Sequence, residues 1–234
     1  MNAIASFVIE RRKIIEGTTE IAFDVAGQDF HFKAGQYIKL TIPELLYNDP
    51  KGNLRLFSIV SSPNEKGRLE IAFRDSDSAF KRTLKESPLG HKVEIQGPYG
   101  LFTLPENQRE SIVFVAGGIG IAPCLSMIRF ATEENLEHPM VLLYSNNSVE
   151  SIAYLEELEK LKIANPHFTF CNHIGYVNTE CIKEMAIDIY KPIWYVVGPP
   201  PMVQATKTFL EELAIDPQKI KFEKFTGVQG VDGK

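Results

Sequence analysis

Two stretches of the sequence place residues that could do chemistry inside otherwise apolar runs. The segment "RLFSIVSSP", residues 55–63, begins with a cation and carries hydroxyl groups at Ser58, Ser61 and Ser62. A strand buried on both faces would exclude such groups, because burying an unpaired charge or hydroxyl is unfavourable. The apolar pattern therefore predicts a strand but leaves the cation and the hydroxyls unexplained.

The second stretch is glycine-rich and suits phosphate binding. The segment "VFVAGGIGIAP", residues 113–123, runs from a buried-type strand into a GGxGxxP turn, and "VVGPPPMV", residues 196–203, again puts glycine at a strand end. Glycines let the backbone approach a phosphate, and the NH groups that open the following helix point at the anion. Two such loops on one edge of a parallel sheet favour a nucleotide crevice. The alternative is a tight strand–helix turn that requires small residues.

The first hundred residues contain the pattern of a β-domain. Short β-branched and aromatic runs are separated by turn segments such as "NDPKGN" and "SPNEKG", which predicts an antiparallel barrel or sandwich. One helix is predicted over residues 78–87. The predicted strands are 5–14, 19–25, 36–42, 56–61, 69–74 and 91–97.

The second half alternates strands with helical patterns, which indicates βαβ units and a parallel sheet. We place the boundary near "LPENQRE", which gives domains of residues 1–105 and 106–234. The predicted strands are 111–118, 140–146, 167–174, 193–200 and 219–225, and the predicted helices are 123–134, 151–165, 179–190 and 201–215.

Composition excludes several classes of function. The net charge of −5 makes nucleic acid an unlikely partner. The three cysteines form no CxxC pair, which argues against a disulfide framework and against a zinc or iron–sulfur site, and the five histidines lack metal spacing. The apolar stretch 112–128 is too short for a membrane span and is interrupted by glycine and proline. With no signal-peptide pattern at the N-terminus, we expect a soluble cytoplasmic protein.

Five ordered elements identify a resemblance that covers nearly the whole chain. They are "AGQY" at 34–37, "RLFS" at 55–58, "GPYG" at 97–100, "AGGIGIAP" at 116–123 and "GPPPM" at 198–202. In this order the chain resembles the ferredoxin–NADP reductase superfamily. The resemblance implies an antiparallel Greek-key FAD-binding β-barrel followed by a parallel-sheet NAD(P)H-binding α/β domain.

The resemblance also assigns roles to the opening segment. Arg55 would pair with the FAD pyrophosphate, which suits a guanidinium that binds phosphate bidentately. Phe57 stands where the family usually has Tyr and would pack on the isoalloxazine or ribityl region. Ser58 would hydrogen-bond near flavin N5, where hydride arrives, and is a predicted catalytic residue. The alternative for Arg55 is a surface salt bridge.

A second phosphate element is expected at "RDSDSAFKR", residues 74–82. Ser78 would be the N-cap, the NH groups of Ala79 and Phe80 would face the pyrophosphate, and Arg74 would add a cation. The alternative is a capped surface helix without a ligand. The further predicted FAD-binding residues are Leu56, Val60, which would line the flavin by its backbone, Ala72 and Phe73.

For the nicotinamide nucleotide, the resemblance implies that the first glycine loop holds the pyrophosphate through Gly117, Gly118, Ile119 and Gly120. The second loop would bound the nicotinamide through Gly198, Pro199, Pro200 and Met202. In the C-terminal "FEKFTG", Glu223 would lie near the site of hydride transfer as a catalytic residue and Phe225 near the flavin. The alternative for that segment is a closing strand with a tail.

The nucleotide preference is predicted from "YSNNSVES", residues 144–151. This segment would contact the ribose through Ser145 and Asn146, and it contains no Lys or Arg for a 2′-phosphate. Because a charged contact is among the stronger hydrogen bonds, its absence favours NADH over NADPH.

The implied function is an FAD-dependent NAD(P)H oxidoreductase. Hydride would pass from NAD(P)H to flavin N5, and single electrons would then reach an acceptor. Since the clustered cysteines of a ferredoxin domain are missing, that acceptor is expected to be separate: a ferredoxin, another redox protein or a small molecule. One alternative is a flavin reductase that uses free flavin as its substrate. Another is a non-catalytic electron-transfer or docking subunit.

Overall fold

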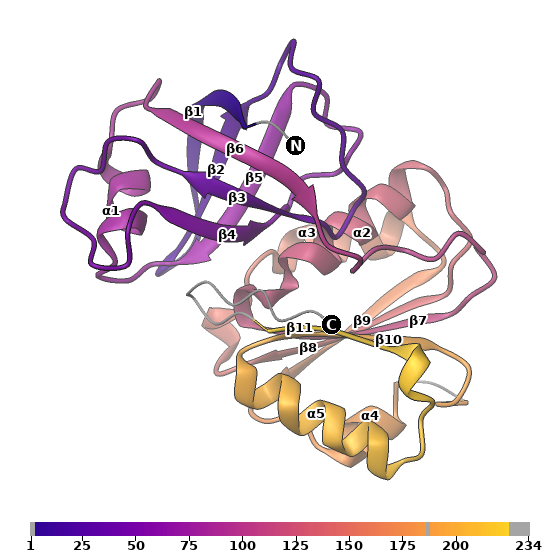
Figure 1. Ribbon diagram of the computed structural model, residues 1–234. Coiled ribbons are helices and arrows are strands. Elements are labelled where there is room, and N and C mark those ends of the chain that lie inside the picture. The colour runs from indigo at the N-terminus through magenta and orange to yellow at the C-terminus, as the bar shows by residue number, and fades with distance from the viewer. Residues whose placement is uncertain (1–2, 186–187, 225–234) are drawn as a thin grey trace.

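The first half of the chain forms a curved antiparallel sheet. The computed structural model describes residues 3–185 and 188–224. Six strands lie in the order β4-β3-β6-β1-β2-β5 (Figure 1). An antiparallel bridge between Ile59 and Ile71 connects the two outer strands, so the sheet closes on itself as a barrel. The elements are β1 Ile4–Ile15, β2 Thr18–Asp24, β3 Tyr37–Thr41, β4 Leu54–Ser58, β5 Arg68–Arg74, α1 Ala79–Glu86 and β6 Lys92–Tyr99.

Alternating side chains produce the barrel core. In β3, Ile38 and Leu40 are fully buried while their neighbours are half-buried, as expected for an antiparallel strand with one face toward a core. Val93 and Ile95 repeat this pattern on β6, which pairs with β3. Helix α1 joins the same core through its buried apolar side chains.

The second half forms a five-stranded parallel sheet in the order β11-β10-β7-β8-β9. All residues of β7 are buried, which is typical of a parallel strand covered on both faces. The strands are β7 Ile112–Gly117, β8 Met140–Asn146, β9 Phe168–Ile174, β10 Ile193–Gly198 and β11 Ile220–Lys224. The helices are α2 Ile121–Glu133, α3 Leu155–Ala164, α4 Thr179–Lys183 and α5 Pro200–Glu212, with 3-10 turns η1 Gly118–Gly120, η2 Val149–Ser151 and η3 Pro217–Lys219.

The helices cover the two faces of this sheet unequally. Helices α2 and α3 lie on the face toward the barrel, and α4 and α5 lie on the opposite face (Figure 1). Barrel residues Ala34, Val60 and Phe102 belong to the same apolar cluster as the buried side of α2, so the two halves share a core. The predicted fold class is confirmed. The predicted boundary at residue 105 falls between β6 and β7 and stays a prediction.

Two helices differ from the prediction. The helix predicted over 179–190 is wrong in its length, since α4 ends at Lys183. Further along, the Asp188 carboxylate accepts from the Tyr190 NH and the Trp194 indole donates to the Ile189 carbonyl, so the chain turns there. Helix α3 begins only at Leu155, because Tyr154 has a left-handed φ of 62°.

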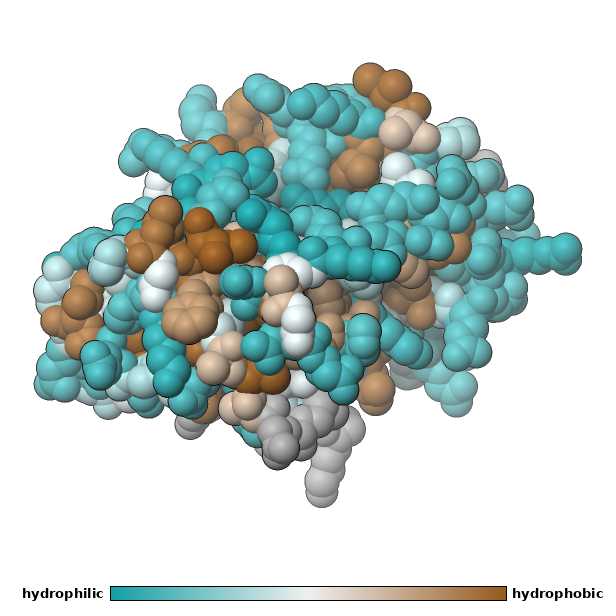
Figure 2. Space-filling model, turned by 90° about the horizontal axis from the view of Figure 1, so that it is seen from above, coloured by the Kyte–Doolittle hydropathy of each residue, from teal (hydrophilic) through white to brown (hydrophobic). Residues whose placement is uncertain are grey.

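The surface of the described residues carries no large apolar face in the view from above. Hydrophilic side chains cover most of that face, and the hydrophobic ones lie in separate groups (Figure 2). Among residues 3–185 and 188–224, no helix is long and apolar enough to cross a membrane.

Candidate cofactor-binding site

The two glycine loops lie against each other at one edge of the parallel sheet. Strands β7 and β10 are neighbours, and Val197 pairs with Ala116 at their carboxyl ends. A Cβ on Gly117 would lie 2.3 Å from the Met202 sulfur, and one on Gly120 would lie 2.8 Å from the Gly198 Cα. The shared edge was predicted correctly. The loops leave no room for side chains at these two glycines, so loop packing by itself accounts for both.

The turn between β7 and α2 also offers donors to an anion. Gly118 has a φ of 54° and is half-buried, as is Ile119. Helix α2 has no side-chain hydrogen bond at its N-cap and no acidic residue in its first turn. The Ile121 NH already donates to carbonyls of the preceding turn and Pro123 has no NH, so an anion here would depend on the backbone of the glycine turn itself. Arg74 reaches this turn from barrel strand β5, with Nη2 3.8 Å from the Cβ position of Gly118. The residues present therefore fit a pyrophosphate.

The end of β8 supplies polar groups beside this turn. Ser145 donates to the Gly175 carbonyl at 2.7 Å, so its hydroxyl proton is used within the chain. Asn146 is buried beside the Tyr144 hydroxyl, yet neither polar atom of its amide has a hydrogen bond of normal geometry among the described residues. A buried amide in this state is a natural partner for a ligand hydroxyl. Tyr144 itself donates to the Gly118 carbonyl at 3.0 Å, which ties β8 to the glycine turn.

In the barrel, Arg55 is buried and its guanidinium is engaged within the chain. Nη1 donates to the carbonyls of Lys51, Gly52 and Leu54 at 2.7–3.0 Å. Nη2 lies 2.9 Å from Oδ1 of Asp49, and both side chains are at most one-tenth exposed. The salt bridge considered from the sequence is present, but it is buried and not at the surface.

The start of α1 is capped by Asp49 and not by Ser78. Oδ2 of Asp49 accepts from the Phe80 NH at 3.0 Å and from the Ser78 hydroxyl at 3.1 Å. Ser78 occupies the predicted N-cap position, but its side chain makes no cap hydrogen bond. A carboxylate from 29 residues earlier supplies that bond instead. The donor set of Arg55, Ser78 and Phe80 still fits a phosphate, because it is the set that an anion holds here.

The aromatic residues of the segment form a cluster inside the barrel. Phe57 stacks on Phe80 with ring centroids 6.0 Å apart and lies 6.0 Å from Phe73. Phe57 is 8% exposed, and Phe80 and Ala79 are buried in the same region. A flavin contact of Phe57 stays a prediction. Leu56, on the other face of β4, is half-buried.

Ser58 is a buried hydroxyl without a partner among the described residues. It is 6% exposed, and its Oγ makes no hydrogen bond. Because buried hydroxyls are nearly always satisfied, this orphaned atom fits the predicted contact with a flavin.

The backbone of Val60 is hydrogen-bonded within the protein. Its NH donates to the Glu70 carbonyl at 2.8 Å, and its carbonyl accepts from Nη1 of Arg129 at 3.0 Å. The side chains of Val60 and Ala72 belong to the core shared with α2. That the Val60 backbone lines the flavin stays a prediction.

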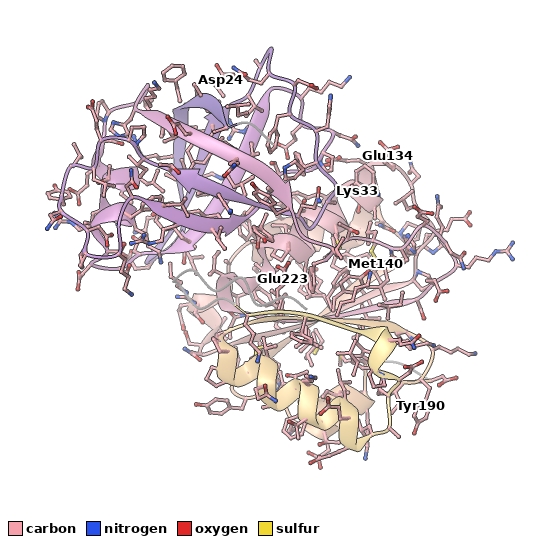
Figure 3. The ribbon with its side chains drawn as sticks, viewed as in Figure 1. Asp24, Lys33, Glu134, Met140, Tyr190 and Glu223 are labelled. Carbon is pink, nitrogen blue, oxygen red and sulfur yellow. The ribbon has the colours of Figure 1, made fainter. Side chains whose placement is uncertain are left out.

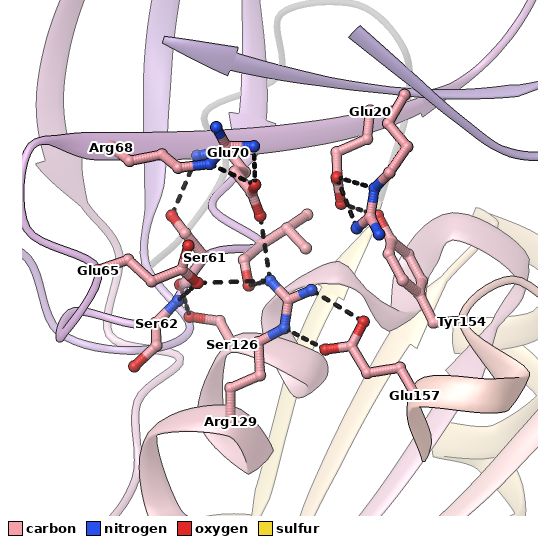
Figure 4. A network of polar contacts seen from close by, with 12 residues as sticks. Glu20, Ser61, Ser62, Glu65, Arg68, Glu70, Ser126, Arg129, Tyr154 and Glu157 are labelled. Atoms are coloured by element: carbon pink, nitrogen blue, oxygen red, sulfur yellow. Dashed lines mark hydrogen bonds and ion pairs between the residues drawn. The ribbon is translucent and has the colours of Figure 1, made fainter. Parts of the chain in front are cut away.

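A polar network links the two domains next to that core (Figure 4). Arg129 on α2 contacts Glu70 of the barrel at 3.2 Å and Glu157 of α3 at 2.6 and 3.0 Å. Nearby, the Tyr154 hydroxyl donates to Glu20 on β2 at 2.7 Å. A cleft of about 460 Å³ over this network is lined by charged side chains and includes no residue of either glycine loop.

Glu223 lies at the junction between the barrel and the parallel sheet (Figure 3). It pairs with Val197 across β10 and β11, and its Oε1 is 3.6 Å from the Cβ position of Gly100 in the barrel. Burial raises the pKa of its carboxyl to about 8, and its charge also raises the pKa of Cys124 and Tyr37, after burial as the main cause. Glu223 is therefore a protonatable group between the domains. Phe225 lies outside the described residues.

Sequence reasoning missed Asp49 and Arg129. The sequence shows Asp49 only as one residue of the turn segment "NDPKGN". In the structure its carboxylate also accepts from the Lys51 NH, as an Asp in a turn commonly does. Its bonds to Ser78 and Phe80 depend on the way the loop folds over α1. Arg129 carried no sequence signal, since a single Arg in a helical pattern is usually exposed.

Family models match both halves of the chain. Residues 6–104 match the oxidoreductase FAD-binding domain and residues 114–208 match the oxidoreductase NAD-binding domain. The reductase component of a propane 2-monooxygenase from Gordonia sp. (strain TY-5) is 29% identical over 86% of this chain and 61% of its own. The electron transfer component of a toluate 1,2-dioxygenase from Pseudomonas putida is 27% identical over 92% of this chain and 65% of its own. The chain thus spans less than two thirds of the length of these relatives.

Solved structures support the same fold. A cytochrome P450 reductase from Amycolatopsis superposes with a TM-score of 0.81 at 22% identity, over 96% of this chain and 70% of that one. Ferredoxin-NADP+ reductase from Plasmodium falciparum superposes with a TM-score of 0.80 at 18% identity, over 96% and 97%. At these identities the likeness concerns the fold alone.

Proposed function

Because the chain belongs to the ferredoxin reductase-like oxidoreductases, which join an FAD-binding and an NAD-binding domain, we propose that it passes electrons from NAD(P)H through FAD to a separate acceptor. The observation that carries this proposal is the meeting of the two predicted sites at the domain junction. Arg74 of the barrel faces the glycine turn at Gly118, and Glu223 of the α/β domain faces Gly100 of the barrel.

Residues of the barrel and of the α/β domain would have different roles at the junction. Bound FAD would supply the redox chemistry, by accepting a hydride and releasing electrons singly. Arg74 and the backbone of the glycine turn, residues 117–120, would hold the nucleotide pyrophosphate, and Asn146 would hydrogen-bond its ribose. Ser58 would donate to the flavin, and Glu223 would keep a proton at the junction near neutral pH, since burial raises its pKa. Together these residues would orient the two cofactors and limit the access of water.

The acceptor and the nucleotide follow from further observations. The relatives are named as a reductase component and an electron transfer component, which supports a separate acceptor such as an oxygenase or another redox protein. NADH is favoured because residues 144–151 contain no Lys or Arg. A cytoplasmic location stays a prediction from the sequence.

An anaerobic titration tests the proposal. Purified protein with flavin bands should bleach on addition of sub-stoichiometric NADH, and more slowly or not at all with NADPH. Bleaching by NADPH alone would contradict the nucleotide preference but keep the oxidoreductase. A flavin-bearing protein inert to both nucleotides would contradict the proposed function.

One observation favours a second function, reduction of free flavin. The predicted pyrophosphate site in the barrel already holds the Asp49 carboxylate, which would weaken the retention of FAD. Gel filtration separates the two functions. Flavin that elutes with the protein supports a bound cofactor, whereas a colourless protein that oxidises NADH only with added flavin supports a flavin reductase.

A further inference from the structure

The loop between β3 and β4, residues 42–53, places an acidic side chain in the site predicted for the FAD pyrophosphate. Its ends are held together by the Ile42 NH, which donates to the Asn53 carbonyl at 2.9 Å, and by the Asn53 amide, which donates back to Ile42 at 3.0 Å. Between these ends the loop folds over α1. The Leu46 NH donates to Thr83 Oγ1 at 3.1 Å, and the Arg82 guanidinium lies 3.9 Å from the centre of the Tyr47 ring.

The Asp49 carboxylate contacts a guanidinium, a hydroxyl and two backbone NH groups in that site. Oδ1 accepts from the Lys51 NH and lies 2.9 Å from Nη2 of Arg55, while Oδ2 accepts from Ser78 and from the Phe80 NH. An ionised carboxyl group offers about four acceptor positions, and three of them accept hydrogen bonds here. The Arg55 Nη2 atom forms an ion pair with Oδ1 but has no hydrogen-bond partner of normal geometry among the described residues. With a side chain only 4% exposed, the carboxylate is held as a bound anion would be.

This donor set is larger than a helix cap requires, and it suits a phosphate group. A cap requires only the NH groups at the start of α1, whereas here a buried guanidinium and a hydroxyl converge on the same two oxygens. A guanidinium, a hydroxyl and the NH groups at a helix start form a general recognition set for phosphate. The pyrophosphate and the Asp49 carboxylate cannot share these donors, because both are negative and would repel each other at contact distance.

We propose that Asp49 is an intramolecular competitor for the FAD pyrophosphate, so that the site binds FAD only when the carboxylate has moved away from Arg55, Ser78 and Phe80. The inference rests on the proposed function, since it concerns the same flavin site. It makes Asp49 a determinant of flavin specificity. The affinity for FAD is reduced by the fraction of molecules in which Asp49 occupies the site, while a flavin without phosphate escapes this reduction.

The experiment compares FAD with riboflavin, which lacks any phosphate. Flavin-free protein is titrated with each, and dissociation constants are measured by calorimetry. Asp49→Asn keeps the size of the side chain and removes its charge. We expect this variant to bind FAD at least tenfold more tightly than the wild type and riboflavin within twofold of it. Glu44→Gln, a change of an exposed acid near the start of the same loop, should leave both constants unchanged.

A second variant and a second measurement guard against misfolding. Asp49→Ala removes both the charge and the hydrogen-bonding atoms, and it too should favour FAD. Without flavin, both variants should melt at a lower temperature than the wild type, because the donors at α1 and Arg55 lose their acceptor. Saturating FAD should raise their melting temperature more than it raises that of the wild type.

The outcomes separate this inference from the function on which it rests. Equal or weaker FAD binding by both Asp49 variants would show that the carboxylate is a permanent structural cap and would overturn the inference, while leaving flavin binding intact. An equal gain for FAD and riboflavin would also overturn it, since the phosphates would then be irrelevant. If neither the wild type nor the variants bind any flavin, the proposed function and the inference both fail.

Discussion

The two predicted phosphate sites are built in opposite ways. The barrel site consists of side chains, with a buried guanidinium at Arg55 that the Asp49 carboxylate neutralises. The α/β site consists mainly of the backbone of the glycine turn, residues 117–120, and its nearest cation, Arg74, comes from the other domain. A buried full charge without a partner costs several kcal/mol, so the barrel site requires an anion even without FAD. Backbone dipoles carry only partial charges, so the glycine site can stay open.

This difference predicts that loss of a charge destabilises the folded protein more at the barrel site than at the glycine site. Arg55→Leu would leave the Asp49 carboxylate buried without its cation, and we expect a loss of about 3–5 kcal/mol in the free energy of unfolding. Urea unfolding of the flavin-free protein measures it.

A matched variant is Arg109→Leu, which removes an exposed guanidinium from the segment between β6 and β7. It should give no measurable change. Adding Asp49→Asn to Arg55→Leu should restore part of the lost stability. An Arg55→Leu protein as stable as the wild type would contradict the contrast between the two sites.

At the glycine site, an added side chain should disrupt binding of the nucleotide by steric clash, without any change of charge. In Gly120→Val the Cβ would lie 2.8 Å from the Gly198 Cα and 3.0 Å from the Val197 carbonyl oxygen. Backbone atoms cannot yield easily, so we expect a loss of about 1–3 kcal/mol in the free energy of unfolding. NADH should no longer bleach the flavin, whereas dithionite should bleach it normally.

The internal control is the flavin content of the Gly120→Val protein. Because the atoms nearest the new side chain belong to Val197 and Gly198 and not to the barrel, this content should equal that of the wild type. Loss of flavin together with NADH reactivity would mean that the two sites are not independent.

A third prediction concerns the junction between the sites, where burial raises the pKa of Glu223 to about 8. The unfolded chain releases this proton near the ordinary glutamate value, so between that value and about pH 8 the folded state binds more protons. The contribution of Glu223 to the free energy of unfolding is therefore fully present below the ordinary glutamate pKa. It is lost as pH rises through this window, by at most about 1.4 kcal/mol per pH unit.

Glu223→Gln should remove this slope. Denaturation midpoints measured from pH 5 to pH 9 should fall less steeply for the variant than for the wild type, and the two curves should meet near pH 5. The exposed Glu212 offers the control Glu212→Gln, which makes the same change of charge. Parallel curves for Glu223→Gln and the wild type would contradict the assignment.

The sequence predicted well what depends on local pattern. Short β-branched and aromatic runs such as residues 36–42 predicted the barrel strands, the apolar run 111–118 predicted β7, and the two glycine loops at strand ends were predicted to lie on one edge of the sheet. Two of the differences from prediction come from contact between residues distant in the chain. Ser78 lost the cap of α1 to Asp49, 29 positions away, and Tyr154 leaves the helical pattern where it donates to Glu20 on the barrel. No local period encodes such contacts.

Ser58 gives the smallest predicted effect on stability and therefore a sensitive test of the barrel site. Its hydroxyl has no hydrogen-bond partner among the described residues, so Ser58→Ala removes no bond and should change the free energy of unfolding by less than about 1 kcal/mol. The neighbouring Ser61 differs, since its Oγ accepts from the buried Glu70 NH at 3.0 Å. Ser61→Ala should cost about 1–3 kcal/mol by leaving that NH unsatisfied.

The order of the two serine variants should be reversed for the rate of flavin reduction, where Ser58→Ala should have the larger effect. If the Ser58 hydroxyl donates to the flavin, its loss should slow the reduction of bound FAD by NADH about 10- to 100-fold in stopped-flow experiments, the equivalent of one hydrogen bond. Ser61→Ala, which removes a bond within the protein, should leave that rate close to the wild-type value. A Ser58→Ala protein that is destabilised but reduced at the normal rate would mean that this hydroxyl serves the fold, and the barrel site would then rely on Arg55 and the start of α1 alone.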